Sequence, residues 1–239
     1  MAMRFRDRED AGRQLADLLR RADLGSADVL VLALPRGGIP VAAQVAQALC
    51  APLDVLVVRK LGVPFQPELA MGAIGEEGVR VENSEVLRLA GLDEDDLAAA
   101  EARERPELER RARLYRDGRA RLSLAGRCVV IVDDGIATGS TVRAACLVAR
   151  GQGVARLVVA VPVASRLATQ DLKDVCDDLF SLAVPEPFYA VGEWYRDFSQ
   201  TTDEEVRVML RRQPWRDNDL GAESGAPQRP HGGGEDDAS

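Results

Sequence analysis

Histidine is almost absent from this chain of 239 residues, and the single one, His231, lies among glycines and acidic residues near the end of the sequence. A histidine-based catalytic triad or zinc site is therefore excluded. Cysteine is scarce as well, and no two of the four cysteines have the Cys-x-x-Cys spacing of a metal or redox site. We expect Cys50, Cys128, Cys146 and Cys176 to be reduced, mostly core residues of a cytoplasmic protein.

Long hydrophobic runs are also missing. The longest, residues 29–34 and 157–161, are far shorter than the roughly 20 apolar residues that span a bilayer. The first ten residues, MAMRFRDRED, lack the apolar core of a signal peptide. These features predict a cytoplasmic protein without a membrane partner.

The chain has no excess of positive charge, because its net charge is −8, which gives no electrostatic reason to expect a general nucleic-acid binder. Residues 217–239 hold six acidic residues and one arginine, so the other 216 residues carry a net charge of only −3. These last residues also lack hydrophobic periodicity. We therefore predict a single domain over residues 1–216, followed by a disordered acidic tail over residues 217–239.

The rest of the sequence alternates between apolar strands and amphipathic helices. Strands are predicted at residues 28–34, 53–59, 129–133, 156–161 and 178–184, and helices at residues 10–20, 39–50 and 140–150. Apolar strands separated by helices are typical of a mostly parallel sheet covered on both faces. The pattern predicts a doubly wound α/β fold.

Two stretches interrupt this alternation. Residues 61–82 are rich in glycine and proline and are expected to hold a short hairpin around Glu76, Glu77 and Gly78. Residues 93–121 form a charged helical insertion, in which Pro106 predicts a break or kink. Its arginines are interpreted as a solvated helix face, with an anion-binding patch as the alternative. These arginines are Arg110, Arg111, Arg113, Arg116, Arg119 and Arg121.

The strongest chemical signal is the segment VVIVDDGIATGST at residues 129–141. Four β-branched residues predict a buried strand, which ends in the two carboxylates of Asp133 and Asp134. A loop of small residues then enters a helix, where backbone N–H groups and hydroxyls can surround an anion. The residues of this loop are Ala137, Thr138, Gly139, Ser140 and Thr141. An anion site beside carboxylates that accept hydrogen bonds from a diol suits a ribose 5-phosphate.

Other phosphate-binding loops fit this segment less well. A Walker loop requires a lysine, which is missing here, and a dinucleotide-binding loop requires a third glycine that the Gly151-Gln152-Gly153 stretch lacks. The structural alternative is a strand whose two aspartates simply cap the next helix.

Residues 129–141 resemble the phosphoribosyl pyrophosphate signature of type I phosphoribosyltransferases, with four hydrophobic residues, two acidic residues, a short loop and Thr-Gly-x-Thr. The resemblance implies that family's doubly wound α/β fold, with residues 61–121 as a lid and helical insertion. It also implies a small hood over residues 184–200 that stacks a nucleobase. The hood candidates are Phe188, Tyr189 and Trp194, and the alternative is a small core that closes the sheet edge.

Two weaker motifs gain meaning from the same resemblance. Arg36, Gly37 and Gly38 match the family's pyrophosphate loop, which often holds a cis peptide bond, although the same residues are compatible with a plain strand-to-helix turn. Arg59 and Lys60 are similar to an Arg-Lys-x-Gly stretch of adenine phosphoribosyltransferases and could hold the departing pyrophosphate. The alternative for this pair is a solvated strand end.

The resemblance further implies an enzyme that transfers the ribosyl group from phosphoribosyl pyrophosphate to a nucleobase-like nitrogen acceptor, with Mg²⁺ as cofactor. Asp134 is then the residue expected to influence Mg²⁺ through water, and a homodimer is compatible with the family. A regulator that senses phosphoribosyl pyrophosphate while binding nucleic acid, and a hydrolase, remain alternatives.

The acceptor base is the least defined part of this prediction. Ala137 stands where hypoxanthine–guanine enzymes carry an aspartate, which argues against a 6-oxopurine. Glu68, Glu76 and Glu77 are the nearest carboxylates in sequence that could contact a base instead.

Overall fold

A central sheet of five parallel strands organises the protein in this computed structural model, which describes residues 5–25 and 28–212. The strand order is β2-β1-β6-β7-β8. The strands are β1 (Val29–Ala33), β2 (Leu53–Val55), β6 (Cys128–Val132), β7 (Arg156–Val163) and β8 (Asp178–Ala183). All five residues of β6 are buried, because this strand is paired on both edges and covered on both faces.

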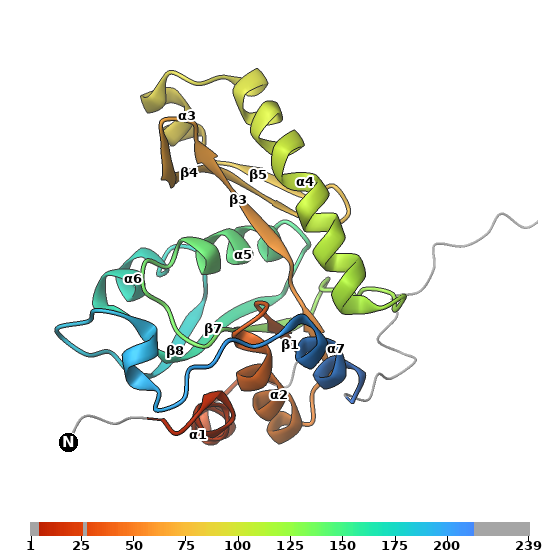
Figure 1. The fold of residues 1–239 in the computed structure, drawn as a ribbon, viewed down its shortest axis with the longest axis vertical. Coiled ribbons are helices and arrows are strands. Elements are labelled where there is room, and N and C mark those ends of the chain that lie inside the picture. Colours follow the sequence, from red (N-terminus) through yellow and green to blue (C-terminus); the bar gives the residue numbers. More distant parts are fainter. Residues whose placement is uncertain (1–4, 26–27, 213–239) are drawn as a thin grey trace, which may run out of the picture.

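Helices cover both faces of this sheet (Figure 1). The helices α1 (Arg8–Arg21) and α2 (Gly38–Leu49) pack on one face, where Val130 and Val132 join their hydrophobic cluster. The helices α5 (Ser140–Arg150) and α6 (Arg166–Asp171) pack on the other face, with Val129 and Ile131. Alternate residues of β6 therefore pack into two hydrophobic cores, one on each face of the sheet, which confirms the predicted doubly wound fold.

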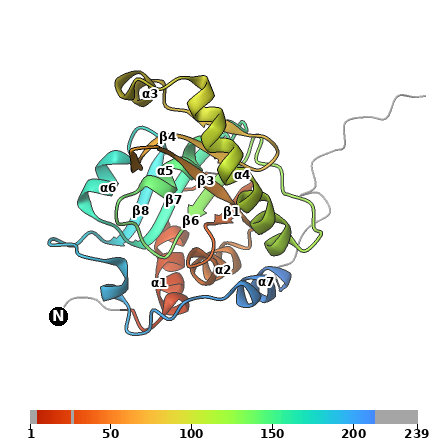
Figure 2. The ribbon, with the colours of Figure 1, turned by 45° about the horizontal axis from the view of Figure 1, so that its top comes forward.

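A second layer, which we call the lid (residues 58–116), stands over the carboxyl edge of the sheet (Figures 1 and 2). It contains the antiparallel strands β3 (Val58–Val63), β4 (Gln66–Gly75) and β5 (Arg80–Glu82), followed by α3 (Ser84–Ala90) and α4 (Glu94–Arg116). The strands β3 and β4 pack against α5. The predicted hairpin is confirmed between β4 and β5, with positive φ angles of 57° at Glu77 and 76° at Gly78.

The prediction of one strand over residues 53–59 is wrong. The chain leaves the central sheet after β2, and β3 pairs instead with β4 in the lid. At the point of departure, the backbone N–H of Val57 donates to the carboxylate of Glu76 at 3.4 Å rather than to a strand neighbour. The apolar run of residues 53–59 is therefore divided between the central sheet and the sheet of the lid.

Of the break or kink predicted at Pro106, the break is wrong, because α4 is one helix of 23 residues that contains the proline. Both Pro106 and Ala102, whose carbonyl loses its helical partner to the proline, are exposed. Water can therefore satisfy that carbonyl, and the helix continues without a protein partner there.

The C-terminal part of the described chain holds a 3₁₀ turn, η1 (Val191–Trp194), and a last helix, α7 (Asp203–Arg211), which the sequence did not predict. The predicted tail at residues 217–239 and His231 lie outside the described residues. The cysteines are free thiols, with Cys50 exposed and the other three buried. Within the described ranges, every helix is too short or too polar to cross a bilayer.

Candidate active site

Asp133 and Asp134 emerge from β6 at the carboxyl edge of the sheet and face the 35–38 loop that follows β1. A methyl group added to Gly37 would lie 2.1 Å from Asp134 Oδ2, and one added to Gly38 would lie 2.6 Å from the carbonyl oxygen of Val132. The Pro35–Arg36 peptide bond in this loop is cis. The two glycines are needed because the loop lies directly against the acidic pair, and so two motifs a hundred residues apart form one structure.

Burial dominates the electrostatics of this pair. It raises the pKa of Asp133 well above the ordinary value, and repulsion from Asp134 adds to that effect. Burial also raises the pKa of Asp134, although the nearby Arg8 opposes the shift. The backbone N–H of Asp134 donates to Asp133 Oδ1 at 2.8 Å. Two desolvated carboxylates at one strand end raise the free energy of the folded state. Hydrogen-bond donors or a cation from a ligand would offset this, as is typical of a binding site.

Arg8, in the first turn of α1, is a site residue that the sequence did not reveal. Its Nε donates to Asp134 Oδ2 at 2.7 Å, its Nη1 donates to the carbonyl of Ser199 at 2.7 Å, and its guanidinium lies 3.9 Å from the centre of the Phe198 ring. The Tyr195 hydroxyl donates to the backbone carbonyl of Asp134 at 2.5 Å. The first helix and the hood therefore hold Asp134 from two sides.

The 137–141 loop leads into α5 with the geometry of an anion site. Gly139 occupies the N-cap position in the left-handed region (φ 79°) and provides no capping side chain, so the first N–H groups of α5 remain available. The loop is fixed from below because Ser165 Oγ donates to the carbonyl of Ala137 at 2.6 Å. Thr138 Oγ1 and Ser140 Oγ lie 3.1 Å apart, and Thr141 is exposed.

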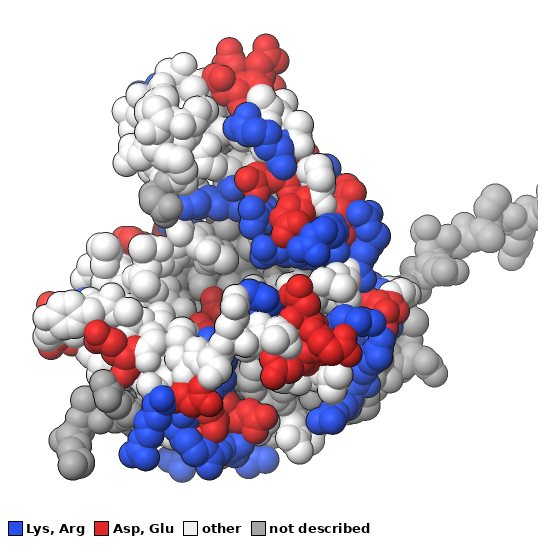
Figure 3. Space-filling model, viewed as in Figure 1, with Lys and Arg blue, Asp and Glu red and all other residues white. Residues whose placement is uncertain are grey.

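A cleft of about 580 Å³ lies between this edge of the sheet and the lid. It is lined by Pro35, Thr141 and Ala144 from below and by Arg59, Lys60, Arg103, Glu104 and Arg111, among others, from the lid. Figure 3 shows basic side chains along the lid side of this hollow. The structure thus brings the predicted Arg59 and Lys60 to the same cleft as Thr141 and the 35–38 loop.

The predicted Arg36 behaves differently from its neighbours Gly37 and Gly38. Its Nη1 lies 3.8 Å from Asp203 Oδ1 at the start of α7, and the buried Tyr115 donates its hydroxyl to the same oxygen at 2.9 Å. In this structure the Arg36 side chain is therefore paired with the last helix, while the backbone of its loop faces the acidic pair.

In a sequence comparison, the phosphoribosyl transferase domain family matches residues 5–193, a range that includes the acidic pair, the 137–141 loop and the 35–38 loop. The chain belongs to this family. Two Mycobacterium tuberculosis proteins, from strains CDC 1551 / Oshkosh and H37Rv, are named as candidate phosphoribosyl transferases and are 55% identical to it over 208 residues. That alignment covers 87% of this chain and 46% of each relative, so the chain spans about half the length of these curated relatives.

The crystal structure of TT1426 from Thermus thermophilus is similar in fold, with a TM-score of 0.82 and 47% identity. The similarity covers 87% of this chain and 98% of the Thermus chain. The two chains therefore share one fold over most of their lengths.

The hood aromatics divide into two groups. Trp194 packs against a small core of Phe5, Ala11 and Tyr195, which agrees with the alternative of a cluster that closes the sheet edge. Tyr189 is 76% exposed and Phe188 is half-buried, so these two side chains are accessible. Base binding by Phe188 and Tyr189 stays a prediction.

The interpretation of the arginine run as one solvated face is wrong for its C-terminal half. Arg116 is buried and pairs with Asp54 (Nε–Oδ1, 3.3 Å) and Glu76, and its Nη2 donates to the carbonyl of Val55 at 2.8 Å. Arg121 pairs with Glu77 at 3.4 Å, and Arg119 donates to the carbonyl of Leu210 at 2.9 Å. Arg116 lies on the inward face of the last turn of α4, and Arg119 and Arg121 follow the helix, so all three side chains join the lid to the body.

The same ion pairs engage two of the three carboxylates that were predicted to contact a base, Glu76 and Glu77. Glu76 is engaged by Arg116, and Glu77 lies at the β4–β5 turn paired with Arg121. Neither carboxylate is among the residues that line the cleft. The side chain of Glu68 lies outside the described part of the structure.

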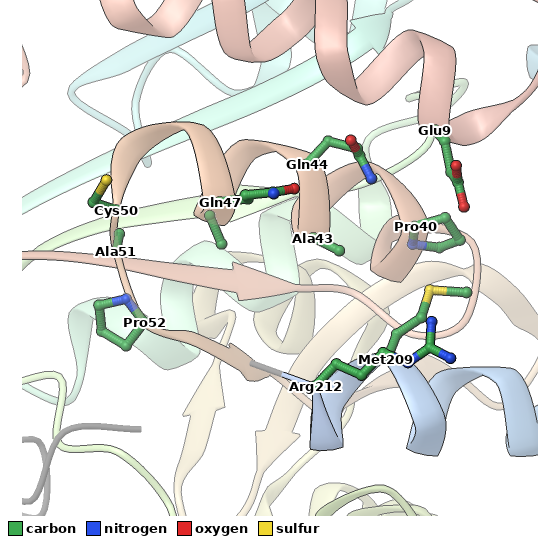
Figure 4. Close-up of a pocket in the computed structure, with 11 residues that line it drawn as sticks. Glu9, Pro40, Ala43, Gln44, Gln47, Cys50, Ala51, Pro52, Met209 and Arg212 are labelled. Carbon is green, nitrogen blue, oxygen red and sulfur yellow. The ribbon is translucent and has the colours of Figure 1, made fainter. Parts of the chain in front are cut away.

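A second cavity of similar size, about 560 Å³, lies between α2 and α7 (Figure 4). Its walls include alanine, glutamine and proline side chains of α2 and its flanks, and its charged lining residues are Glu9 and Arg212. Unlike the cleft under the lid, it lacks the predicted phosphate-binding residues among its described lining. We therefore place the candidate active site under the lid.

Proposed function

We propose that the protein transfers the ribosyl 5-phosphate group of phosphoribosyl pyrophosphate to a nitrogen nucleophile and releases pyrophosphate. The observation that carries this proposal is the convergence of three groups at one sheet edge. These are the half-buried pair of Asp133 and Asp134, the uncapped start of α5 at Gly139, and the turn at Gly37 and Gly38. Each suits a different part of the substrate.

The substrate parts can be assigned by chemistry. The ribose hydroxyls donate hydrogen bonds to the carboxylates of Asp133 and Asp134, and the 5-phosphate accepts hydrogen bonds from the N–H groups and hydroxyls of residues 137–141. The pyrophosphate lies between the 35–38 loop and the basic residues Arg59 and Lys60. Asp134 has its Oδ2 occupied by Arg8, so it contributes its other oxygen or exchanges partners.

In the reaction the bond between the anomeric carbon and the pyrophosphate oxygen breaks, and a bond from that carbon to the acceptor nitrogen forms. The departing pyrophosphate keeps the electron pair, and the acceptor nitrogen releases a proton. Charge develops on the ribosyl ring and on the leaving group, so positioning and electrostatic stabilisation supply most of the catalysis. Arg59 and Lys60 stabilise the leaving group, and the lid keeps water away from the reactive carbon.

Mg²⁺ belongs to the same proposal. Among the described residues, no group of three or more histidine, cysteine, aspartate or glutamate side chains could enclose a metal ion by itself. Mg²⁺ commonly uses one or two carboxylates together with substrate phosphates and waters, and the acidic pair fits that role. Because Arg8 already engages Asp134, Asp133 is the better candidate of the two, which reverses the sequence-based preference for Asp134. When bound, the ion would offset the charge of the pyrophosphate.

The acceptor remains the most open part, and we propose an aminopurine or a pyrimidine-like ring rather than a 6-oxopurine. Ala137 has no acid to offer at the loop, and Glu76 is paired with Arg116. The accessible rings of Tyr189 and Phe188 are the groups available for stacking.

The nucleic-acid-binding alternative loses its main support in the arginine run. Arg116 and Arg121 are internal, and Arg110 and Arg113 are paired with glutamates of their own helix. Little of the run is therefore left as a continuous basic surface.

A direct test measures pyrophosphate release from phosphoribosyl pyrophosphate and Mg²⁺ in the presence of adenine, hypoxanthine, guanine, uracil or orotate. Release that depends on one base supports the transferase, and release without any base supports a hydrolase. Calorimetric titration with phosphoribosyl pyrophosphate provides the binding arm. Absence of binding would refute the proposed function.

A further inference from the structure

Helix α4 belongs to the charged insertion, yet one of its faces forms a wall of the cleft. Ala100, Arg103, Glu104 and Arg111 all line the cleft, and their spacing places them along one side of the helix. The same side carries Leu97, Leu108 and Tyr115 into the core, which fixes the rotation of the helix relative to the cleft.

The cleft as a whole is strongly cationic. Four of its lining side chains, Arg59, Lys60, Arg103 and Arg111, are basic, and Glu104 is the acidic residue among those that line it. Glu104 and Arg59 neutralise each other, since Glu104 Oε2 lies 2.7 Å from Nε and 2.5 Å from Nη2 of Arg59, and the positive charge of the lining then comes from Lys60, Arg103 and Arg111. Cations gathered around one cavity favour a ligand with several negative charges.

Arg111 is held in a way that permits it to exchange partners. Its Nε donates to Glu107 Oε1 at 2.6 Å, but Glu107 also accepts two hydrogen bonds from Arg110, at 2.7 and 3.0 Å. These two arginines lower the pKa of Glu107 to about 2. Glu107 therefore keeps a cationic partner when Arg111 turns towards a ligand, so the exchange leaves no carboxylate unpaired.

A third observation separates Arg111 from its neighbours in the arginine run. Arg113, two residues further along, is 73% exposed and pairs with Glu109, whereas the Arg111 side chain is 35% exposed and lines the cleft. Arg111 also lies close enough to Tyr115 to affect its ionisation, as does Arg36. Arg111 is thus near Tyr115, whose hydroxyl contacts the same Asp203 oxygen as Arg36 of the 35–38 loop. Arg111 lies on the opposite side of the cleft from α5.

We propose that Arg103 and Arg111 of α4 bind the diphosphate group of the substrate from the lid side, opposite the 35–38 loop. This inference rests on the proposed function and extends it, because it assigns a binding role to the helical insertion. In this arrangement Arg59 and Lys60 approach the diphosphate from β3, and the two α4 residues complete its cationic surroundings. The insertion then supplies part of the affinity for pyrophosphate, before and after the transfer.

The experiment is calorimetric titration of the full chain with inorganic pyrophosphate and Mg²⁺, and in parallel with phosphoribosyl pyrophosphate. The variants are Arg103→Gln, Arg111→Gln and the double variant, with Arg113→Gln as the matched control on the same helix. Glutamine keeps helix propensity, and both cleft positions are at least partly exposed, so the variants are expected to fold, which thermal melts verify.

We expect Arg111→Gln to weaken pyrophosphate binding about ten-fold, as loss of one charge-assisted contact does, and the double variant to weaken it further. Arg113→Gln should stay within about two-fold of the unmodified protein. Unchanged affinity in the double variant, or an equal loss in Arg113→Gln, would overturn the role of α4 while leaving the proposed function in place. Failure of the unmodified protein to bind either probe would overturn both.

Discussion

The buried cluster around Arg116 joins the lid to the central sheet. Replacing Arg116 by methionine should show how much this cluster contributes to the free energy of unfolding. The Arg116 side chain is 8% exposed, and its partners Asp54 and Glu76 are 3% and 9% exposed. Asp54 also accepts a hydrogen bond from the N–H of Leu122 at 3.2 Å. Methionine fills most of the volume but leaves both carboxylates without their cation.

Removing one partner of a buried ion pair typically costs about 3–5 kcal/mol, because the remaining charge is desolvated without compensation. Two carboxylates are orphaned here, but methionine retains some packing, so we expect a loss of about 3–4 kcal/mol in the free energy of unfolding at pH 7. For a protein of this size, that corresponds to a fall of roughly 6–16 °C in Tm.

Urea unfolding monitored by circular dichroism measures the loss, with Arg113→Met as a control that should change stability by no more than about 0.5 kcal/mol. The triple variant with Asp54→Asn and Glu76→Gln should recover much of the lost stability at pH 7. A variant as stable as the unmodified protein, or a triple variant that recovers none of the lost stability, would refute the account of the cluster.

Three further predictions concern the acidic pair and its neighbours. Asp133→Asn should abolish tight binding of phosphoribosyl pyrophosphate yet raise stability at pH 8. This follows because burial raises the pKa of Asp133, so the charged form destabilises the folded state as pH rises through that pKa. Urea titrations at pH 8 and pH 4 should show the gain only at pH 8, and an equal gain at both would contradict the reasoning. Gly37→Ala should weaken binding at least ten-fold in calorimetry, since its methyl group would lie 2.1 Å from Asp134 Oδ2, and undiminished affinity would count against the contact. Ala137→Asp should raise kcat/KM for hypoxanthine relative to adenine, and a protein that already prefers hypoxanthine or guanine would show the inference from Ala137 to be wrong.

The elements that the sequence predicted correctly are those that depend on local sequence. The strand of residues 129–132, the acidic pair and the 137–141 loop are contiguous, so the strand, its end and the helix start could be predicted without knowing any long-range contact. The alternation of apolar strands and helices likewise depends on local periodicity, and it sufficed to predict the doubly wound sheet.

Tertiary structure alone decided the rest. Arg8 and Tyr195 carry no motif, and they reach Asp134 only because α1 and the hood fold back over β6. Arg111, Arg113 and Arg116 are the same residue type within one turn or two of helix, yet one lines the cleft, one faces water and one is buried with Asp54 and Glu76. Composition assigns them a single role, whereas the rotation of α4 against the sheet gives each a different one, because partners distant in sequence determine which charges are desolvated.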